Sequence, residues 1–233
     1  MRSLLNPENP AMRFLTKIGY AICLNFLWFI CCLPVITAGA STTALYAVTQ
    51  KMVRDEEGNI FSAFFIALKQ NFRQATRIWM IMLAGGVLLA FDGYLLFHLK
   101  NMNAFWTVLT AVWIVLFAAY CLILLFVFPL TARFENTTFA TIRNALLTGM
   151  HYLLCTALIA AFHFAVGYII IFIYTPVLFL GEGICALFSS WIMKNILIRL
   201  EEMALPAGPP SAMPGEDAGQ DEIAPSAARS MHP

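Results

Sequence analysis

The chain has 233 residues, of which 61% are hydrophobic and 12% are charged, and its formal net charge is +1. Its mean hydropathy is +0.77. A soluble domain carries nearer a quarter charged residues, so this composition argues against a soluble fold and predicts that the length is spent on membrane-spanning helices. No uniformly basic face is present, which argues against nucleic-acid binding.

The first 17 residues carry Arg2, Arg13 and Lys17 and lead into an apolar run. Residues 14–33 give about 30 Å of helix, which is a full span and longer than the apolar region of a signal peptide. Residues 38–40 resemble a signal-peptidase cleavage site, but the length of the basic region and of the run predicts an uncleaved first span.

The apolar run is then interrupted by Pro34 and Gly39, and three hydroxyl residues start a second helix. Residues 40–53 reach only about 21 Å, less than the roughly 30 Å hydrocarbon core. This short helix either lies on the membrane surface or returns through the membrane, in part as a re-entrant segment. We expect non-helical backbone at membrane depth to be covered, so that later spans pack around residues 34–43.

The middle of the chain begins with a charged turn at residues 55–59, followed by aromatic residues at helical spacing with basic residues beside them. This pattern predicts an amphipathic helix at the membrane interface, or a packed connector that feeds the next span. Further spans are expected at residues 78–98, 104–128, 150–173 and 177–198. Asn136, Thr137 and Thr138 offer N-cap chemistry for a connecting helix before the third of these spans.

The distribution of basic residues chooses between the two arrangements. If the short helix returns, 13 of the 14 Lys and Arg residues lie on the inner side and Lys100 alone lies outside. We therefore predict an all-α polytopic membrane bundle of about six segments, the second short, with both termini in the cytoplasm. Residues 1–203 form the membrane domain. Residues 204–233, rich in Ala, Pro, Gly, Ser and acids, form a disordered cytoplasmic tail.

Ionisable residues inside spans are costly and are candidates for function. Asp92 and Glu182 are expected toward the same outer side and so to line one vestibule. The alternative is that each reaches interfacial water or, for Glu182, caps a helix N-terminus. His163 shares a face with small residues and is expected to hydrogen-bond across helices or to relay protons. Lys194 is expected to extend to the cytoplasmic interface.

The broken element is the best candidate binding segment, because free backbone donors and hydroxyls at a helix N-terminus bind solutes in many transporters. Its candidate residues are Pro34, Thr37, Gly39, Ser41, Thr42 and Thr43. The alternative is that the hydroxyls only cap the helix. The six cysteines lie in apolar runs without ligand spacing, so no disulfide, metal or cofactor is expected. No catalytic motif is present, and we expect no enzyme activity.

The chain resembles the YesL family of bacterial integral membrane proteins. The resemblance rests on Leu33-Pro34, Thr37, Gly39, the Ser41-Thr42 pair and Ala44-Leu45-Tyr46, and continues through residues 51–58, 64–75 and 128–134. It covers residues 6–202, and Ala40 departs from the pattern, where many relatives have Pro. The family carries no established activity. It implies a multi-pass protein of the bacterial cytoplasmic membrane, whose relatives are often encoded beside carbohydrate uptake systems.

Three functions remain open at this point. The first is an accessory or scaffold protein in the lipid bilayer that works beside the permease subunits of a carbohydrate transporter. The second is a small-solute transporter or channel, expected as a homo-oligomer, with its site near residues 34–43. The third is a membrane enzyme acting on lipid or glycan through Asp92 and His163.

Overall fold

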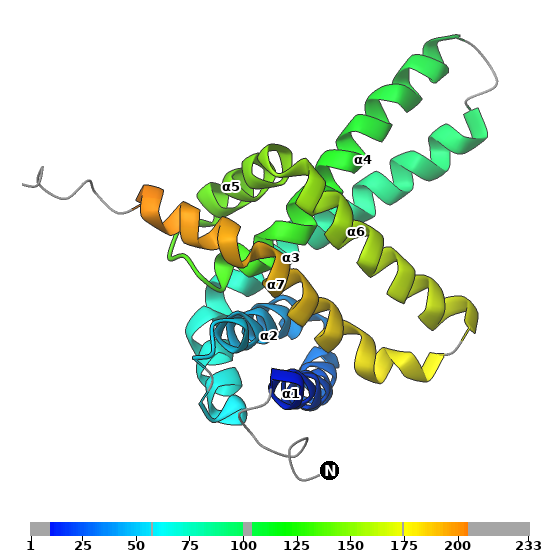
Figure 1. Ribbon diagram of the computed structural model, residues 1–233. Coiled ribbons are helices and arrows are strands. Elements are labelled where there is room, and N and C mark those ends of the chain that lie inside the picture. The colour runs from blue at the N-terminus through cyan, green and yellow to red at the C-terminus, as the bar shows by residue number, and fades with distance from the viewer. Residues whose placement is uncertain (1–9, 57, 100–103, 174, 205–233) are drawn as a thin grey trace, which may run out of the picture. The chain divides into compact units, whose positions relative to one another are not determined.

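The computed structural model describes residues 10–56, 58–99, 104–173 and 175–204 (Figure 1). The expected tail therefore lies outside the described residues beyond Ala204. In chain order the elements are α1 (Pro10–Cys32), a 3₁₀ turn (Val35–Thr37), α2 (Ala38–Val53), α3 (Ile60–Leu99), α4 (Ala104–Thr131), α5 (Thr138–His151), α6 (Leu153–Tyr168), a π-helical turn (Ile169–Ile173), a 3₁₀ turn (Thr175–Val177) and α7 (Leu178–Ala204). The described residues contain no strand.

Five helical segments among the described residues are long and apolar enough to cross a membrane. They are Met12–Cys32, Ile60–His98, Phe105–Thr131, Leu153–Ile173 and Leu180–Met203. With α2 as an additional short helix, the architecture is the predicted all-α polytopic membrane fold. The N-cap predicted for α5 is also present, because the Thr137 hydroxyl accepts a hydrogen bond from the Ala140 amide.

The chain divides into two compact units, Met1–Ile196 and Leu197–Pro233. This boundary falls inside α7, so the described part of the second unit is the end of that helix. The first unit holds the membrane-length helices α1, α3, α4 and α6 entire, together with α2.

The short helix α2 lies at the centre of the first unit. It contacts α1, α3 and α4, and 12 of its 16 residues are buried. The Gln50 side chain donates a hydrogen bond to the Pro129 carbonyl of α4, 2.9 Å away. That carbonyl is a natural acceptor near the end of α4, and the bond satisfies a buried amide. Helix α2 is thus packed inside the unit, as the returning arrangement requires.

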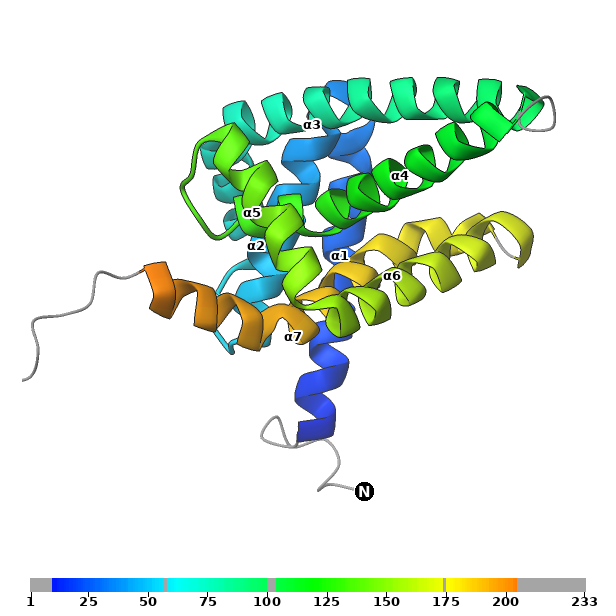
Figure 2. The same cartoon turned by 90° about the horizontal axis from the view of Figure 1, so that it is seen from above.

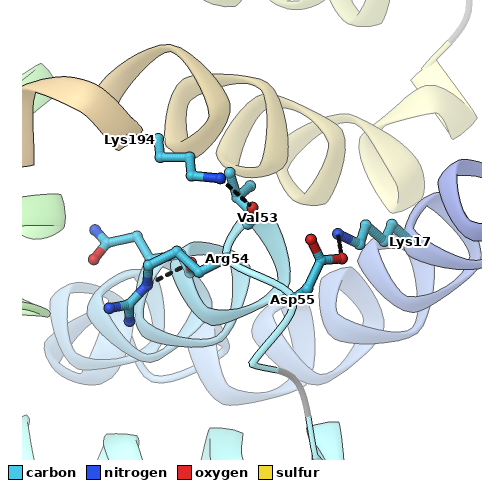
Figure 3. A network of polar contacts seen from close by, with 6 residues as sticks. Lys17, Val53, Arg54, Asp55 and Lys194 are labelled. Carbon is cyan, nitrogen blue, oxygen red and sulfur yellow. Dashed lines mark hydrogen bonds and ion pairs between the residues drawn. The ribbon is translucent and has the colours of Figure 1, made fainter. Parts of the chain in front are cut away.

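Helices α1 and α2 form an antiparallel hairpin that is closed by charged groups at one end (Figure 3). The Lys17 ammonium lies 2.7 Å from the Asp55 carboxylate, so the start of α1 and the end of α2 lie side by side. Lys194 of α7 donates to the Val53 carbonyl over 3.3 Å. Lys194 thus contacts the carbonyl end of α2, where a cation is favoured, and its extension to the interface stays a prediction.

Helix α3 is longer than expected, since it runs without interruption over 40 residues. The amphipathic segment and the following span are therefore one helix, in which the first half feeds the second. Figures 1 and 2 show that α3 and α4 lie side by side as a hairpin. The hairpin is held by Tyr120, which donates to the Met82 carbonyl, and by Trp113, which donates to the Leu89 carbonyl.

Candidate functional site

The turn between α1 and α2 satisfies its own polar groups. The Thr37 hydroxyl lies 2.6 Å from the Cys31 carbonyl and 2.7 Å from the Pro34 carbonyl. The Trp79 indole of α3 donates to the Val35 carbonyl over 2.7 Å. Val35 and Ile36 are each 59% exposed. The expectation that later spans cover the whole of residues 34–43 is therefore wrong for the turn itself, which is closed by local hydrogen bonds and one indole.

Burial begins at Gly39, where α2 and α3 approach closely. A Cβ atom at this position would collide with the Trp79 side chain and lie 2.9 Å from the Ala75 carbonyl. Only glycine therefore allows this contact, and the small residue places the first turn of α2 deep in the unit. Gly39 is therefore a packing residue, and the candidates with polar side chains in α2 come after it in the sequence.

The three candidate hydroxyls at the start of α2 have different environments. Thr42 and Thr43 each donate to the carbonyl four residues earlier, over 2.9 Å. They thus bind the helix carbonyls rather than cap its free amides, and Thr42 also accepts a hydrogen bond from the Trp28 indole. Ser41 is fully buried, and its hydroxyl lies beside Cys32 but has no partner within hydrogen-bonding geometry among the described residues. A buried polar group without a partner is costly, and such groups often mark a binding site.

The packing of α2 against α7 brings Ser41 level with Glu182. The Thr49 and Ser190 hydroxyls lie 2.9 Å apart, and Lys194 reaches Val53 one helical turn further along. Both pairs are separated by 141 residues, so the two helices run parallel and in step. Glu182 is likewise 141 residues after Ser41, so these two residues lie at the same level of the helix pair.

Glu182 lies among titratable groups from four helices. Its carboxylate interacts electrostatically with the imidazole of His163 on α6. It also interacts with Cys32 at the end of α1 and with Tyr46 of α2. Glu182 and His163 are both half-buried. The structure therefore brings together two of the residues singled out from the sequence, and it adds Tyr46 and Cys32 to them.

The tautomer of His163 follows from its hydrogen bond. Its Nδ1 atom lies 2.9 Å from the Ile159 carbonyl of its own helix. Because a carbonyl oxygen only accepts, Nδ1 must carry a proton in this geometry. Nε2 is then the ring nitrogen that is available for proton transfer or for a ligand.

Two further polar groups of this region were not found from the sequence. Ser189 is fully buried without a hydrogen-bond partner, beside Tyr46 but outside hydrogen-bonding geometry. Asn25 is fully buried and accepts a hydrogen bond from the Gly183 amide over 2.6 Å. An asparagine inside an apolar run and a serine pair inside the last span were the available signals. We call Ser41, Tyr46, His163, Glu182 and Ser189 the polar core.

Asp92 lies elsewhere, in the distal half of the α3–α4 hairpin. It is exposed and lines a hollow of about 290 Å³ with apolar residues of both helices, among them Leu96, Trp106 and Leu109. The adjacent Gly93 packs against the Trp113 ring, which fixes the two helices together. Among the described residues, Asp92 forms no hydrogen bond or ion pair. Asp92 and Glu182 thus belong to separate sites, and no described contact supports a shared vestibule.

The fold and the apolar helices define the class of protein, a polytopic membrane protein. Residues 21–93 match the model of a family described as "Protein of unknown function, DUF624". This match spans the second half of α1, all of α2 and most of α3, including Ser41 and Asp92. Comparisons with curated proteins and with solved structures give no match.

Proposed function

We propose that this protein is an accessory membrane protein whose α3–α4 hairpin binds a helix of another membrane protein. The observation that carries the proposal is the exposed Asp92 in an otherwise apolar hollow of the hairpin. A carboxylate on a membrane helix is costly and normally finds a partner. The partner expected here contributes a basic or hydrogen-bonding side chain to Asp92 and apolar side chains to the rest of the hollow.

The hairpin is suited to this role because hydrogen bonds within it hold its two helices together. Its indole and phenol hydrogen bonds, from Trp113 and Tyr120, join α3 to α4 from within. Gly86 and Gly93 leave the space that these two rings occupy. The outward faces remain apolar, with Leu88 65% exposed and Val115 68% exposed. A preformed surface loses little conformational entropy on binding.

The resemblance to the YesL family supports a more specific partner. Relatives of that family are encoded beside carbohydrate uptake systems in bacteria, so the proposed partner is a permease subunit of such a transporter in the cytoplasmic membrane. A second copy of this chain is the competing partner. In the proposed topology both termini are cytoplasmic, since this arrangement leaves the fewest basic residues outside.

Site-specific photo-crosslinking of the full chain tests the proposal. A photoreactive residue at Leu88 or Val115 is expected to capture a neighbouring permease subunit when both are expressed together. The control position is Leu154 on α6, which is 79% exposed and lies outside the hairpin. Asp92→Asn is expected to weaken capture at both hairpin positions, while Asp92→Glu retains part of it. Equal capture from Leu154, or capture of lipid alone at all positions, contradicts the proposal.

The polar core supports a second candidate function, a small-solute transporter or channel. The specific observation is that two fully buried hydroxyls, of Ser41 and Ser189, lack partners near Glu182. A polar solute between the helices would provide those partners. Solute flux in proteoliposomes tests this candidate: Ser41→Ala and Glu182→Gln should abolish flux, whereas Asp92→Asn should not. The absence of flux for every sugar and ion tried removes this candidate.

For the third function, a membrane enzyme, we propose no catalytic residue. His163 is neighbour to Glu182 rather than to Asp92, so the pair first considered for chemistry is not adjacent in the described contacts.

A further inference from the structure

The first half of α3 carries a second hollow that neither the hairpin nor the polar core includes. Its volume is about 460 Å³, and it is lined by Phe65, Leu68, Lys69, Gln70, Phe72 and Arg73. Two cations and two phenyl rings thus share one surface of a single helix. A ligand that fits this surface needs a negative group and an apolar portion.

The basic residues of this surface are arranged in one row. Lys69, Arg73 and Arg77 follow each other at four-residue intervals, so they lie on one face of α3. All three are exposed. The ion pairs of Lys17 with Asp55 and of Arg54 with Glu56 lie outside this row, and no acidic residue is paired with Lys69, Arg73 or Arg77 among the described residues. Like charges at this spacing repel, and an anion bound between them relieves the repulsion.

The position of the row along α3 identifies the anion. A helix of 40 residues is about 60 Å long, which is twice the roughly 30 Å hydrocarbon core. The uncharged part from residue 78 to residue 91 belongs in the core, so the charged half extends to the level of the lipid headgroups. α3 carries no acidic residue before Asp92 that would compete for the cations.

The aromatic residues beside the row distinguish a lipid from a soluble anion. Phe61 is 49% exposed, Phe65 53% and Phe72 40%. Exposed rings next to basic residues on an amphipathic helix insert at the boundary between headgroups and acyl chains. A soluble phosphate would leave these rings in water.

We propose that Lys69 and Arg73, with Arg77 beside them, bind the phosphate of an anionic phospholipid, whose acyl chain packs along Phe65 and Phe72. Arginine and lysine are the usual phosphate ligands, and juxtamembrane basic clusters attract anionic lipids. This site anchors the first half of α3 at the membrane surface, before the part of the helix that pairs with α4. It is independent of the proposed partner and of the polar core.

The test measures lipid binding to the purified full chain in detergent by native mass spectrometry. The chain is titrated with phosphatidylglycerol or with phosphatidylcholine. We expect tighter binding of phosphatidylglycerol, and a loss of about tenfold or more in its affinity for the variant K69Q/R73Q. The charge-matched control is K51Q/R143Q, which removes two exposed basic residues from α2 and α5 and should retain binding.

Three further arms make the result decisive. The charge-retaining variant K69R/R73K should bind phosphatidylglycerol nearly as well as the natural chain, which separates a lost site from a misfolded protein. Inorganic phosphate at millimolar concentration should not displace the lipid. Displacement by phosphate, equal binding of the two lipids, or an equal loss in K51Q/R143Q would overturn the proposal.

Discussion

The ammonium of Lys17 lies 2.7 Å from the carboxylate of Asp55, which joins the first half of α1 to the turn that follows α2 (Figure 3). Asp55 has a φ of 58°, a left-handed conformation that usually falls to glycine or asparagine. The Glu56 amide donates to the Lys51 carbonyl, and the Asp55 amide to the Met52 carbonyl. This pattern is a Schellman end. The ion pair therefore closes the hairpin at the point where the chain reverses into α3.

The stability of this end should depend on pH. The hydrogen bond and the positive charge of Lys17 hold the pKa of Asp55 below its ordinary value of 3.8. A carboxyl with a lowered pKa in the folded state contributes stability above its unfolded pKa and loses it as the pH falls through the folded value. Asp55→Asn, which keeps the left-handed preference, should lower Tm slightly at pH 7, and this effect should shrink as the pH falls below 3.8 and through the lower pKa of the folded state. Thermal unfolding measured across this pH range checks the prediction.

The partner variant provides the control for that prediction. Lys17→Gln should lower Tm at pH 7 by as much as Asp55→Asn, and the double variant should be no worse than either single one. Because the pair is exposed, high salt should reduce all three differences. Additive losses in the double variant would show that the two side chains act separately.

Gly183 should be intolerant of any side chain. A Cβ atom there would collide with the Ala21 carbonyl of α1 and lie 3.0 Å from the Asn25 Cβ atom. Gly183→Ala must push α7 away from α1 and should cost about 1–3 kcal/mol in the free energy of unfolding. Gly19→Ala on α1 is the matched control, since an added Cβ there meets nothing within 4 Å. Unfolding in denaturant measures both, and equal effects would contradict the close approach.

The hydroxyl pair between α2 and α7 should show energetic coupling. Thr49 and Ser190 are buried with their oxygens 2.9 Å apart, although Thr49 also binds the Leu45 carbonyl of its own helix. A double-mutant cycle of Thr49→Val and Ser190→Ala should give a coupling of about 0.6 kcal/mol, the usual size for such pairs in membranes. The cycle of Thr110→Val with Ser190→Ala should give none, because Thr110 binds the carbonyl of Trp106 on its own helix.

Removal of the Ser41 hydroxyl should stabilise the fold. The group is buried without a partner, so Ser41→Ala removes an uncompensated desolvation cost and should raise the free energy of unfolding by about 1 kcal/mol. Thr43→Val is the contrast, since the Thr43 hydroxyl is satisfied by the Gly39 carbonyl. A destabilised Ser41→Ala protein would mean that the hydroxyl has a bonding partner in solution.

Local pattern alone determined the all-α membrane class, the break at Pro34, the short length of α2 and an N-cap within residues 136–138. These features depend on hydropathy along one segment and on backbone preferences of single residues, which act without the rest of the chain. Local pattern did not give the length of α3. The polarity changes between its two halves, but a helix continues through such a change when no helix-breaking residue interrupts it.

Tertiary packing decided where the candidate residues meet. It separated Asp92 from Glu182, placed His163 beside Glu182, and left the Pro34 turn exposed while it buried Ser41. Hydropathy gives the residues that belong in the membrane, but not which helix faces which. That choice follows from close contacts at glycines such as Gly39 and Gly183, and from interhelical hydrogen bonds whose partners lie far apart in the chain.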